Sequence, residues 1–242
     1  MSAPGTYTVR RSTRAHAARL IVRPDGEVVV TLPLRAPERW AERLVAERAA
    51  WIEHHRARLS TERARLAARP ALGQGRALSF GGVAHELVVA SAEGRSRTLV
   101  EHPDAEALEE RSAIRVWLAP GDERPPALIL ERWLRGQART ALQRRIAIRS
   151  RDLGVEPRRL SVRDQRSRWG SASRRGTISF SWRLILAPAA VLDYVVVHEL
   201  AHLRYFGHGP RFWALVRRHV PEADVHRRWL RTHDADLRHA LD

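Results

Sequence analysis

Residues 195–213 read VVVHELAHLRYFGHGPRFW, so three histidines and a glutamate lie in an otherwise apolar run. Burying polar, ionisable groups costs several kcal/mol unless each group finds a partner. A single structure that compensates all four residues together would remove this cost. Their spacing indicates how this can happen.

The first two histidines and the glutamate form the pattern HExxH, with His198, Glu199 and His202. On an α-helix, residues i and i+4 differ by about 40° around the axis. Both imidazoles can therefore point at one spot, about 2.0–2.1 Å from each nitrogen, as zinc requires. Glu199 lies one step round the helix and can reach a water molecule in the site. The pattern predicts two metal ligands and a general base.

A catalytic zinc site needs a third protein ligand and an open fourth position. His208 is the natural candidate, although a straight helix would carry it about 9 Å beyond His202 along the axis. Gly207 can end the helix, and the chain can then turn back to present His208. An acidic residue further along the chain is the alternative third ligand, with Glu222 the best placed in sequence.

The composition excludes several other chemistries. The 242 residues include no cysteine and no lysine, so all 43 basic residues are arginine. P-loop NTPases, Schiff-base enzymes, thiolate nucleophiles and cysteine-based zinc sites are therefore not expected. The formal net charge of +16 is compatible with a nucleic-acid partner, but it does not define a site for one.

No apolar stretch approaches 18 residues, and the first 20 residues lack the apolar core of a signal peptide. We therefore expect no transmembrane helix and a cytoplasmic location.

Apolar periodicity and turn residues predict a mixed set of elements. The expected strands lie within 7–33, 77–118, 158–164 and 177–182, and the expected helices lie at about 37–68, 127–153, 188–206, 210–218 and 222–232. In the strand TISFSW (177–182), apolar and small polar residues alternate, which predicts a half-buried strand. Leu128 is expected on the apolar side of the helix that ends before Gly154.

The stretch PGDERPP (120–126) is the best candidate for a domain boundary. It separates a β-rich N-terminal domain with one long helix (1–122) from a C-terminal domain that carries HExxH (123–242). The expected fold class is therefore α+β.

Four segments resemble the YgjP-like metallopeptidases, a family of small zinc-dependent peptidases related in motif to the SprT-like and WLM families. They are RSRWGSAS (166–173), GTISFSWRLILAP (176–188), VVVHELAHL (195–203) and HGPRFWALV (208–216), and the start VRRSTRAHAARLIVRPDGEVVVTLP (9–33) is similar too. The resemblance implies a zincin-like domain with a small sheet over the active-site helix. It also implies that His198, His202 and His208 bind Zn²⁺ and that Glu199 is the catalytic acid/base.

Three functions are consistent with these residues. The first is a zinc metallopeptidase acting on peptides or proteins, with the edge of the TISFSW strand available to pair with an extended substrate. The second is a peptidase that acts on DNA-bound proteins, as the SprT-like relatives suggest. The third is a metal-dependent nucleotide phosphohydrolase, in which arginines bind phosphate. The sequence does not define the oligomeric state or the role of the N-terminal region.

Overall fold

The computed structural model describes residues 6–70, 72–73, 75–102, 113–165 and 167–242. The chain divides into two compact units, Met1–Arg69 and Pro70–Asp242. The boundary expected at 120–126 falls inside the second unit, because the strands before it share one hydrophobic core with the helices after it. The expected α+β class is confirmed.

The first unit is a small sheet with two helices. Its strands are β1 (Tyr7–Ser12), β2 (Arg19–Val22) and β3 (Val28–Pro33), in the order β1-β3-β2, with β1 parallel and β2 antiparallel to β3. The single helix expected over 37–68 is divided at Arg48 into α1 (Arg39–Glu47) and α2 (Ala49–Ala67). Buried side chains of β3, α1 and α2 form a core of its own for this unit.

The second unit begins with a four-stranded sheet. Its strands are β4 (Ala77–Phe80), β5 (Val83–Ser91), β6 (Leu99–Glu101) and β7 (Ala113–Leu118), in the order β4-β5-β7-β6. The β4–β5 turn donates two backbone hydrogen bonds, from Gly81 to the Ile185 carbonyl at 2.8 Å and from Gly82 to the Leu186 carbonyl at 3.1 Å. These bonds join the sheet to the segment that leads into the HExxH helix.

Helix α3 (Pro126–Leu153) is the longest helix in the described part of the chain, and it ends as expected at Gly154, which has a left-handed conformation (φ 61°, ψ 45°). Its buried face follows an i, i+4 row of apolar residues: Leu130, Leu134, Ala138, Leu142 and Ile146. Leu128, expected on this face, is 58% exposed instead. It lies two residues before Leu130, about 200° round the helix from that row.

A three-stranded sheet in the order β8-β10-β9 precedes the HExxH helix. It consists of β8 (Arg159–Arg163), β9 (Gly170–Ala172) and β10 (Thr177–Ser181), with β10 parallel to β8 and antiparallel to β9. The strand expected to be half-buried is buried on both faces, since Ser179 and Ser181 are as buried as Ile178 and Phe180. As the central strand, β10 also has no free edge, so a substrate strand cannot pair with it.

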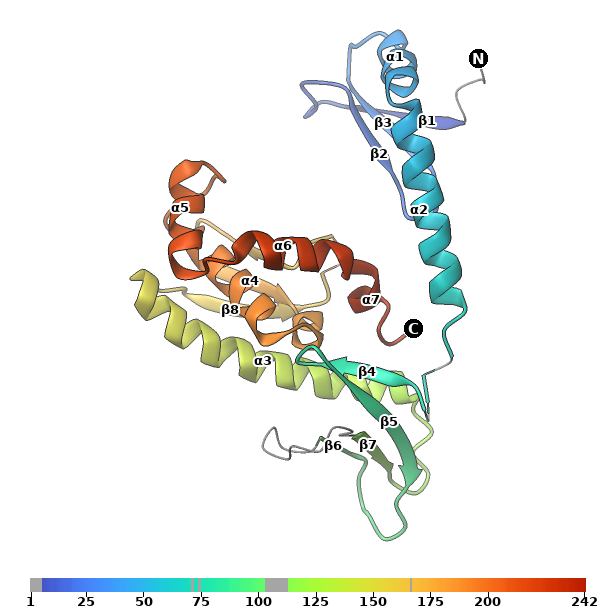
Figure 1. Cartoon of the computed structure of the whole chain (residues 1–242), viewed down its shortest axis with the longest axis vertical. Helices are drawn as coiled ribbons and strands as arrows, with labels where there is room; N and C mark the ends of the chain where they lie inside the picture. Colours follow the sequence, from blue (N-terminus) through green and yellow to red (C-terminus); the bar gives the residue numbers. More distant parts are fainter. Residues whose placement is uncertain (1–5, 71, 74, 103–112, 166) are drawn as a thin grey trace. The chain divides into compact units, whose positions relative to one another are not determined.

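The short helix η1 (Trp182–Leu186) leads into α4 (Ala189–Ala201), which carries the HExxH residues. Figure 1 shows α4 among the other elements of the second unit, and it contacts α3, α5, α6, η1 and β9. The remaining helices are α5 (Pro210–His219), α6 (Ala223–Thr232) and α7 (Asp234–Arg238). None of the helices in the described ranges has the length and apolar character needed to cross a bilayer.

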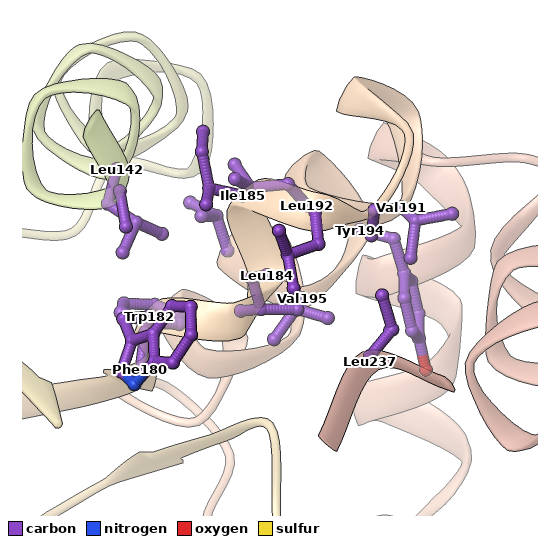
Figure 2. Close-up of a cluster of buried hydrophobic side chains, with 14 of the residues drawn as sticks. Leu142, Phe180, Trp182, Leu184, Ile185, Val191, Leu192, Tyr194, Val195 and Leu237 are labelled. Carbon is purple, nitrogen blue, oxygen red and sulfur yellow. The ribbon is translucent and has the colours of Figure 1, made fainter. Parts of the chain in front are cut away.

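Apolar packing and ion pairs between Asp193 and two arginines of α3, Arg149 and Arg145, fix α4 in the second unit. Side chains from α3, η1, α4 and α7 meet in its core, as Figure 2 shows for Leu142, Ile185, Val195 and Leu237. Asp193 of α4 is buried and accepts two hydrogen bonds from the Arg149 guanidinium, from Nη2 at 2.6 Å and from Nε at 3.0 Å. A bidentate pair of this kind adds geometric definition to non-directional packing.

The contact between the β4–β5 turn and the start of α4 depends on a glycine. A Cβ on Gly82 would lie 2.6–2.8 Å from atoms of Pro188, whereas a Cβ on Gly81 would meet nothing within 4 Å. Both glycines have positive φ, so an alanine is strained at either position. We expect Gly82→Ala to lower the free energy of unfolding by about 1–3 kcal/mol more than Gly81→Ala, as overpacking does. Urea denaturation of the two variants measures the difference, and equal losses would contradict the contact.

Candidate metal centre

The three histidines of residues 195–213 converge on one point. The ligand nitrogens of His198, His202 and His208 all lie within 4.8 Å of one another. The Nε2 atoms of His198 and His208 are 3.2 Å apart. Two nitrogens bound to one tetrahedral zinc at 2.0–2.1 Å would be about 3.3 Å apart. The donor set and its spacing therefore fit a zinc ion.

The local backbone explains how the third histidine reaches the other two. Helix α4 ends at Ala201, earlier than expected, but His202 keeps helical dihedral angles (φ −65°, ψ −20°) at its C-terminal cap. His202 therefore retains its i, i+4 relation to His198. After one further turn the chain leaves the helix, and α5 begins at Pro210. The reversal between the two helices brings His208 back beside His198.

The backbone also orients the ring of His202. Its Nδ1 lies 3.0 Å from the Tyr205 carbonyl oxygen. A carbonyl only accepts, so Nδ1 carries the hydrogen and Nε2 is left as the metal-binding nitrogen. For His198, by contrast, Nδ1 is buried with no hydrogen-bond partner in the described part of the chain. The His198 ring is therefore positioned by packing alone.

Phe212, the third residue of α5, provides that packing. Its ring centroid lies 4.9 Å from the centroid of His198, 4.5 Å from that of His202 and 4.8 Å from that of His208. The side chain is almost completely buried. One apolar ring thus supports all three imidazoles. In the sequence, Phe212 was noted only as part of the PRFW segment that resembles the family. Spacing alone does not distinguish a core phenylalanine from one that supports a site.

Burial sets the protonation of the site. It lowers the pKa of His198 to about 3, and the neighbouring histidines and Arg227 act in the same direction. Burial likewise lowers the pKa of His202, against the effect of the Tyr205 carbonyl. Both rings are therefore neutral near pH 7, and the neutral imidazole is the form that binds a metal.

Glu199 faces a different flank of α4, toward strand β9. Its carboxylate is buried, and burial raises the pKa of this carboxyl to about 7, while Arg168 opposes the shift. A Cβ on Gly170 would lie 2.6 Å from Glu199 Oε1 and Cγ. Only a glycine in β9 permits this approach. No local sequence pattern identifies Gly170, because its role depends on a contact between distant segments.

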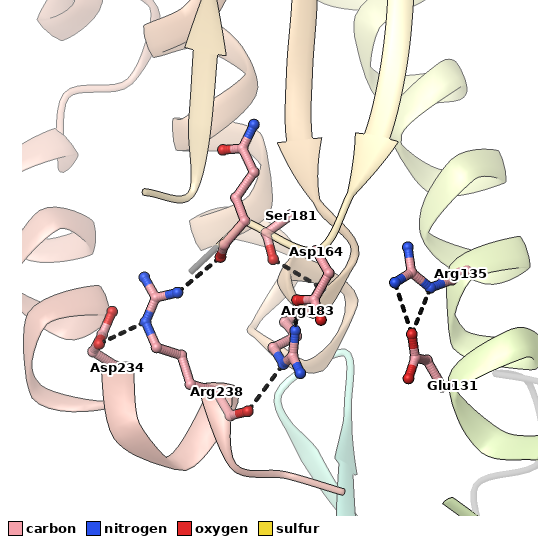
Figure 3. Close-up of polar contacts among 8 residues, drawn as sticks. Glu131, Arg135, Asp164, Ser181, Arg183, Asp234 and Arg238 are labelled. Atoms are coloured by element: carbon pink, nitrogen blue, oxygen red, sulfur yellow. Dashed lines mark hydrogen bonds and ion pairs between the residues drawn. The ribbon is translucent and has the colours of Figure 1, made fainter. Parts of the chain in front are cut away.

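Polar contacts from η1 and α7 hold the segment that leads into β9 (Figure 3). Arg183 forms an ion pair with Asp164 and donates a hydrogen bond to the Arg238 carbonyl at 3.0 Å. Arg238 in turn donates to the Gln165 carbonyl at 2.9 Å, and its guanidinium lies 4.7 Å from the Trp169 ring centroid. These contacts keep β9, and hence Gly170, against Glu199.

Glu222, the alternative third ligand, is not among the residues of this cluster. It lies at the N-terminal cap of α6, its side chain is 75% exposed, and its carboxylate is 3.9 Å from His226. Among the described residues, only the three histidines form a group able to hold a metal ion.

Comparison with known proteins identifies a family for this chain. Neither the curated proteins nor the solved structures gave a match. The sequence model of the YgjP-like metallopeptidase domain matches residues 16–233 and therefore covers most of both units. The chain belongs to the YgjP-like metallopeptidase family.

Proposed function

We propose that this metallopeptidase is zinc-dependent, with His198, His202 and His208 as the metal ligands and Glu199 as the general base. The convergence of three imidazoles on one point, with the buried carboxylate of Glu199 on the same helix as two of them, supports this proposal most directly. Three histidines with an open fourth position are typical of catalytic rather than structural zinc. A bound zinc ion would supply Lewis-acid chemistry, polarising a carbonyl group and making water more acidic.

Glu199 would transfer the protons. Its carboxylate would accept a proton from the attacking water and deliver it to the amine that leaves when the peptide bond breaks. Gly170, which has no Cβ, leaves the carboxylate room beside β9. Arg168 favours the ionised form, which is the form that can accept a proton.

The outer edge of β9 would hold the substrate backbone, in place of the TISFSW strand. Backbone hydrogen bonds pair Trp169 with Ser181 and Ser173 with Thr177. In an antiparallel ladder alternate residues point toward the partner strand, so Gly170 and Ala172 direct their backbone N–H and C=O groups away from β10. An extended peptide could pair with these groups next to Glu199.

The alternatives from the sequence use the same residues. A nucleotide phosphohydrolase would need the same metal and base, and a DNA-associated peptidase would add a nucleic-acid surface to the same centre. The match to a metallopeptidase family favours peptide hydrolysis over phosphate hydrolysis.

The first prediction from the proposed function concerns Glu199→Gln, which keeps the shape of the side chain and removes the base. We expect peptide hydrolysis to fall about 10²–10⁴-fold while zinc content is unchanged. A casein-type substrate and a nucleoside triphosphate, assayed side by side with the wild type and the variant, measure this effect. Persistent peptidase activity in the variant would exclude Glu199 as the base, and activity on the triphosphate alone would favour the phosphohydrolase.

The second prediction concerns Gly170→Ala, which would push a methyl group into the Glu199 carboxylate. We expect the peptidase kcat to fall on the order of 10²-fold, because small misplacements of catalytic groups are costly, while zinc affinity is retained. Gly136→Ala in α3 is the control, since its Cβ meets nothing within 4 Å. Equal activity of the two variants would contradict the proposed contact.

The third prediction concerns Phe212→Leu, which removes the ring that supports the three histidines. We expect zinc affinity to fall about 10–100-fold, as when other groups that orient ligands are lost. Phe180→Leu is the control, because Phe180 is fully buried in the same core and no ring contact joins it to a histidine of the site in the described part of the chain. Competition with a zinc chelator measures both affinities. If the two variants lose affinity equally, the effect is general destabilisation.

A further inference from the structure

An arginine of α6, Arg227, lies near the three histidines and has no counter-ion among the described residues. The guanidinium of Arg227 is 5.4 Å from the ring centroid of Trp213. That indole is itself 5.8 Å from the ring of His198 and 5.9 Å from the ring of His208. Arg227 is therefore separated from the rings of His198 and His208 by the one indole ring that contacts all three side chains.

Arg217 provides an informative contrast with Arg227. It contacts the same indole, at 5.5 Å, but forms an ion pair with Asp224 at 3.1 Å. No ion pair or hydrogen bond of the Arg227 side chain is found within the described ranges, and its contact there is with Trp213. One of the two arginines is thus neutralised, while the other keeps its five donors free.

We propose that Arg227 binds the oxyanion that develops on the substrate carbonyl during peptide hydrolysis. This inference rests on the proposed peptidase function. As the water oxygen bonds to the carbonyl carbon, the π electron pair moves to the carbonyl oxygen, and Glu199 takes the proton that the water loses. The guanidinium of Arg227 then donates hydrogen bonds to the negative oxygen. When the C–N bond breaks, the electron pair returns and the proton passes to the leaving amine.

The charges of the site before the reaction explain why an unpaired arginine would favour catalysis there. A cation beside a metal site is repelled by the metal, so it stabilises the resting state little. It becomes stabilising when negative charge appears on the substrate. Interactions that strengthen only in the transition state are those that raise kcat.

Two other side chains near the site are less suitable. His226 contacts the ring of Tyr194 at 6.1 Å, but it makes no ring contact with the three histidines among the pairs found in the described residues. Tyr194 does contact His198, at 5.9 Å, but it is only 4% exposed and its ring lies in the core (Figure 2). Burial also raises the pKa of the Tyr194 hydroxyl. Arg227, by contrast, is exposed and permanently charged.

The test compares Arg227→Ala with Arg217→Ala in the zinc-loaded protein. We expect Arg227→Ala to lower kcat about 10²–10³-fold with little change in KM, as loss of one oxyanion donor does, and to leave zinc content unchanged. Added guanidinium should restore part of the activity of Arg227→Ala. Arg217→Ala should keep the wild-type kcat. The loss of kcat in Arg227→Ala should be equal for a substrate with a free terminal carboxylate and for the amide of that substrate.

Binding provides a second measurement that does not require turnover. A phosphinic peptide resembles the tetrahedral anion, and calorimetry should show that Arg227→Ala binds it at least about 10²-fold more weakly than the wild type. In the Glu199→Gln background, the uncleaved substrate peptide should bind with the same affinity whether or not Arg227 is replaced. This pair of ligands separates oxyanion binding from ground-state binding.

Several results would overturn the inference. Arg227 would have another role if Arg227→Ala left kcat unchanged or lost zinc. The same would hold if the loss were confined to KM or to substrates with a free carboxylate. These outcomes leave the proposed peptidase intact. If the wild-type protein hydrolyses no peptide and does not bind the phosphinic peptide, the proposed function itself fails and the inference fails with it.

Discussion

The burial of ionisable groups on α4 is the constraint on which the rest of the site depends. The helix is packed on most of its surface, yet it carries a histidine and a glutamate inside that packing. Near neutral pH, burial favours the uncharged form of His198 and makes ionisation of Glu199 more costly. The shift of the Glu199 pKa from 4.5 to about 7 corresponds to about 3 kcal/mol against the charged form. The fold thus maintains protonation states that suit the proposed metal binding and proton transfer, although burying these groups lowers its own stability.

The surroundings of α4 explain how these states are held in one geometry. Phe212 supports the imidazoles from α5, and Gly170 of β9 limits where the Glu199 carboxylate can lie. Strand β9 is in turn held through its lead-in segment by Arg183 and Arg238. Segments separated by tens of residues therefore cooperate, and each controls one side of the helix. A loss of packing at any of them would move a proposed ligand or the proposed base without removing either side chain.

The sequence was sufficient for those parts of this arrangement that depend on local geometry. The i, i+4 histidines follow from the helical period, and Gly207 with Pro210 indicates a reversal that could return His208 to them. Contacts between distant segments were not accessible in the same way. The approach of Gly170 to Glu199 requires the register of β9 against β10, which no local pattern specifies.

The errors in the predicted fold have the same physical origin. The PGDERPP stretch resembles a linker, but the strands before it and α3 after it share one core, so the units divide at residue 69. The alternation in TISFSW predicted one solvent-exposed face. The serines on that face are small and are buried too, so the central strand is buried on both faces. Composition in this arginine-rich chain is equally ambiguous. Arg149 and Arg183 are paired with acidic residues of the framework, whereas Arg168 favours the ionised form of Glu199 and Arg227 has no ion pair in the described ranges. Arg227 is exposed and its only contact in the described ranges is with Trp213, so its donors are available to an anion that forms at the site, and this availability is what would distinguish it from the general positive charge of the chain.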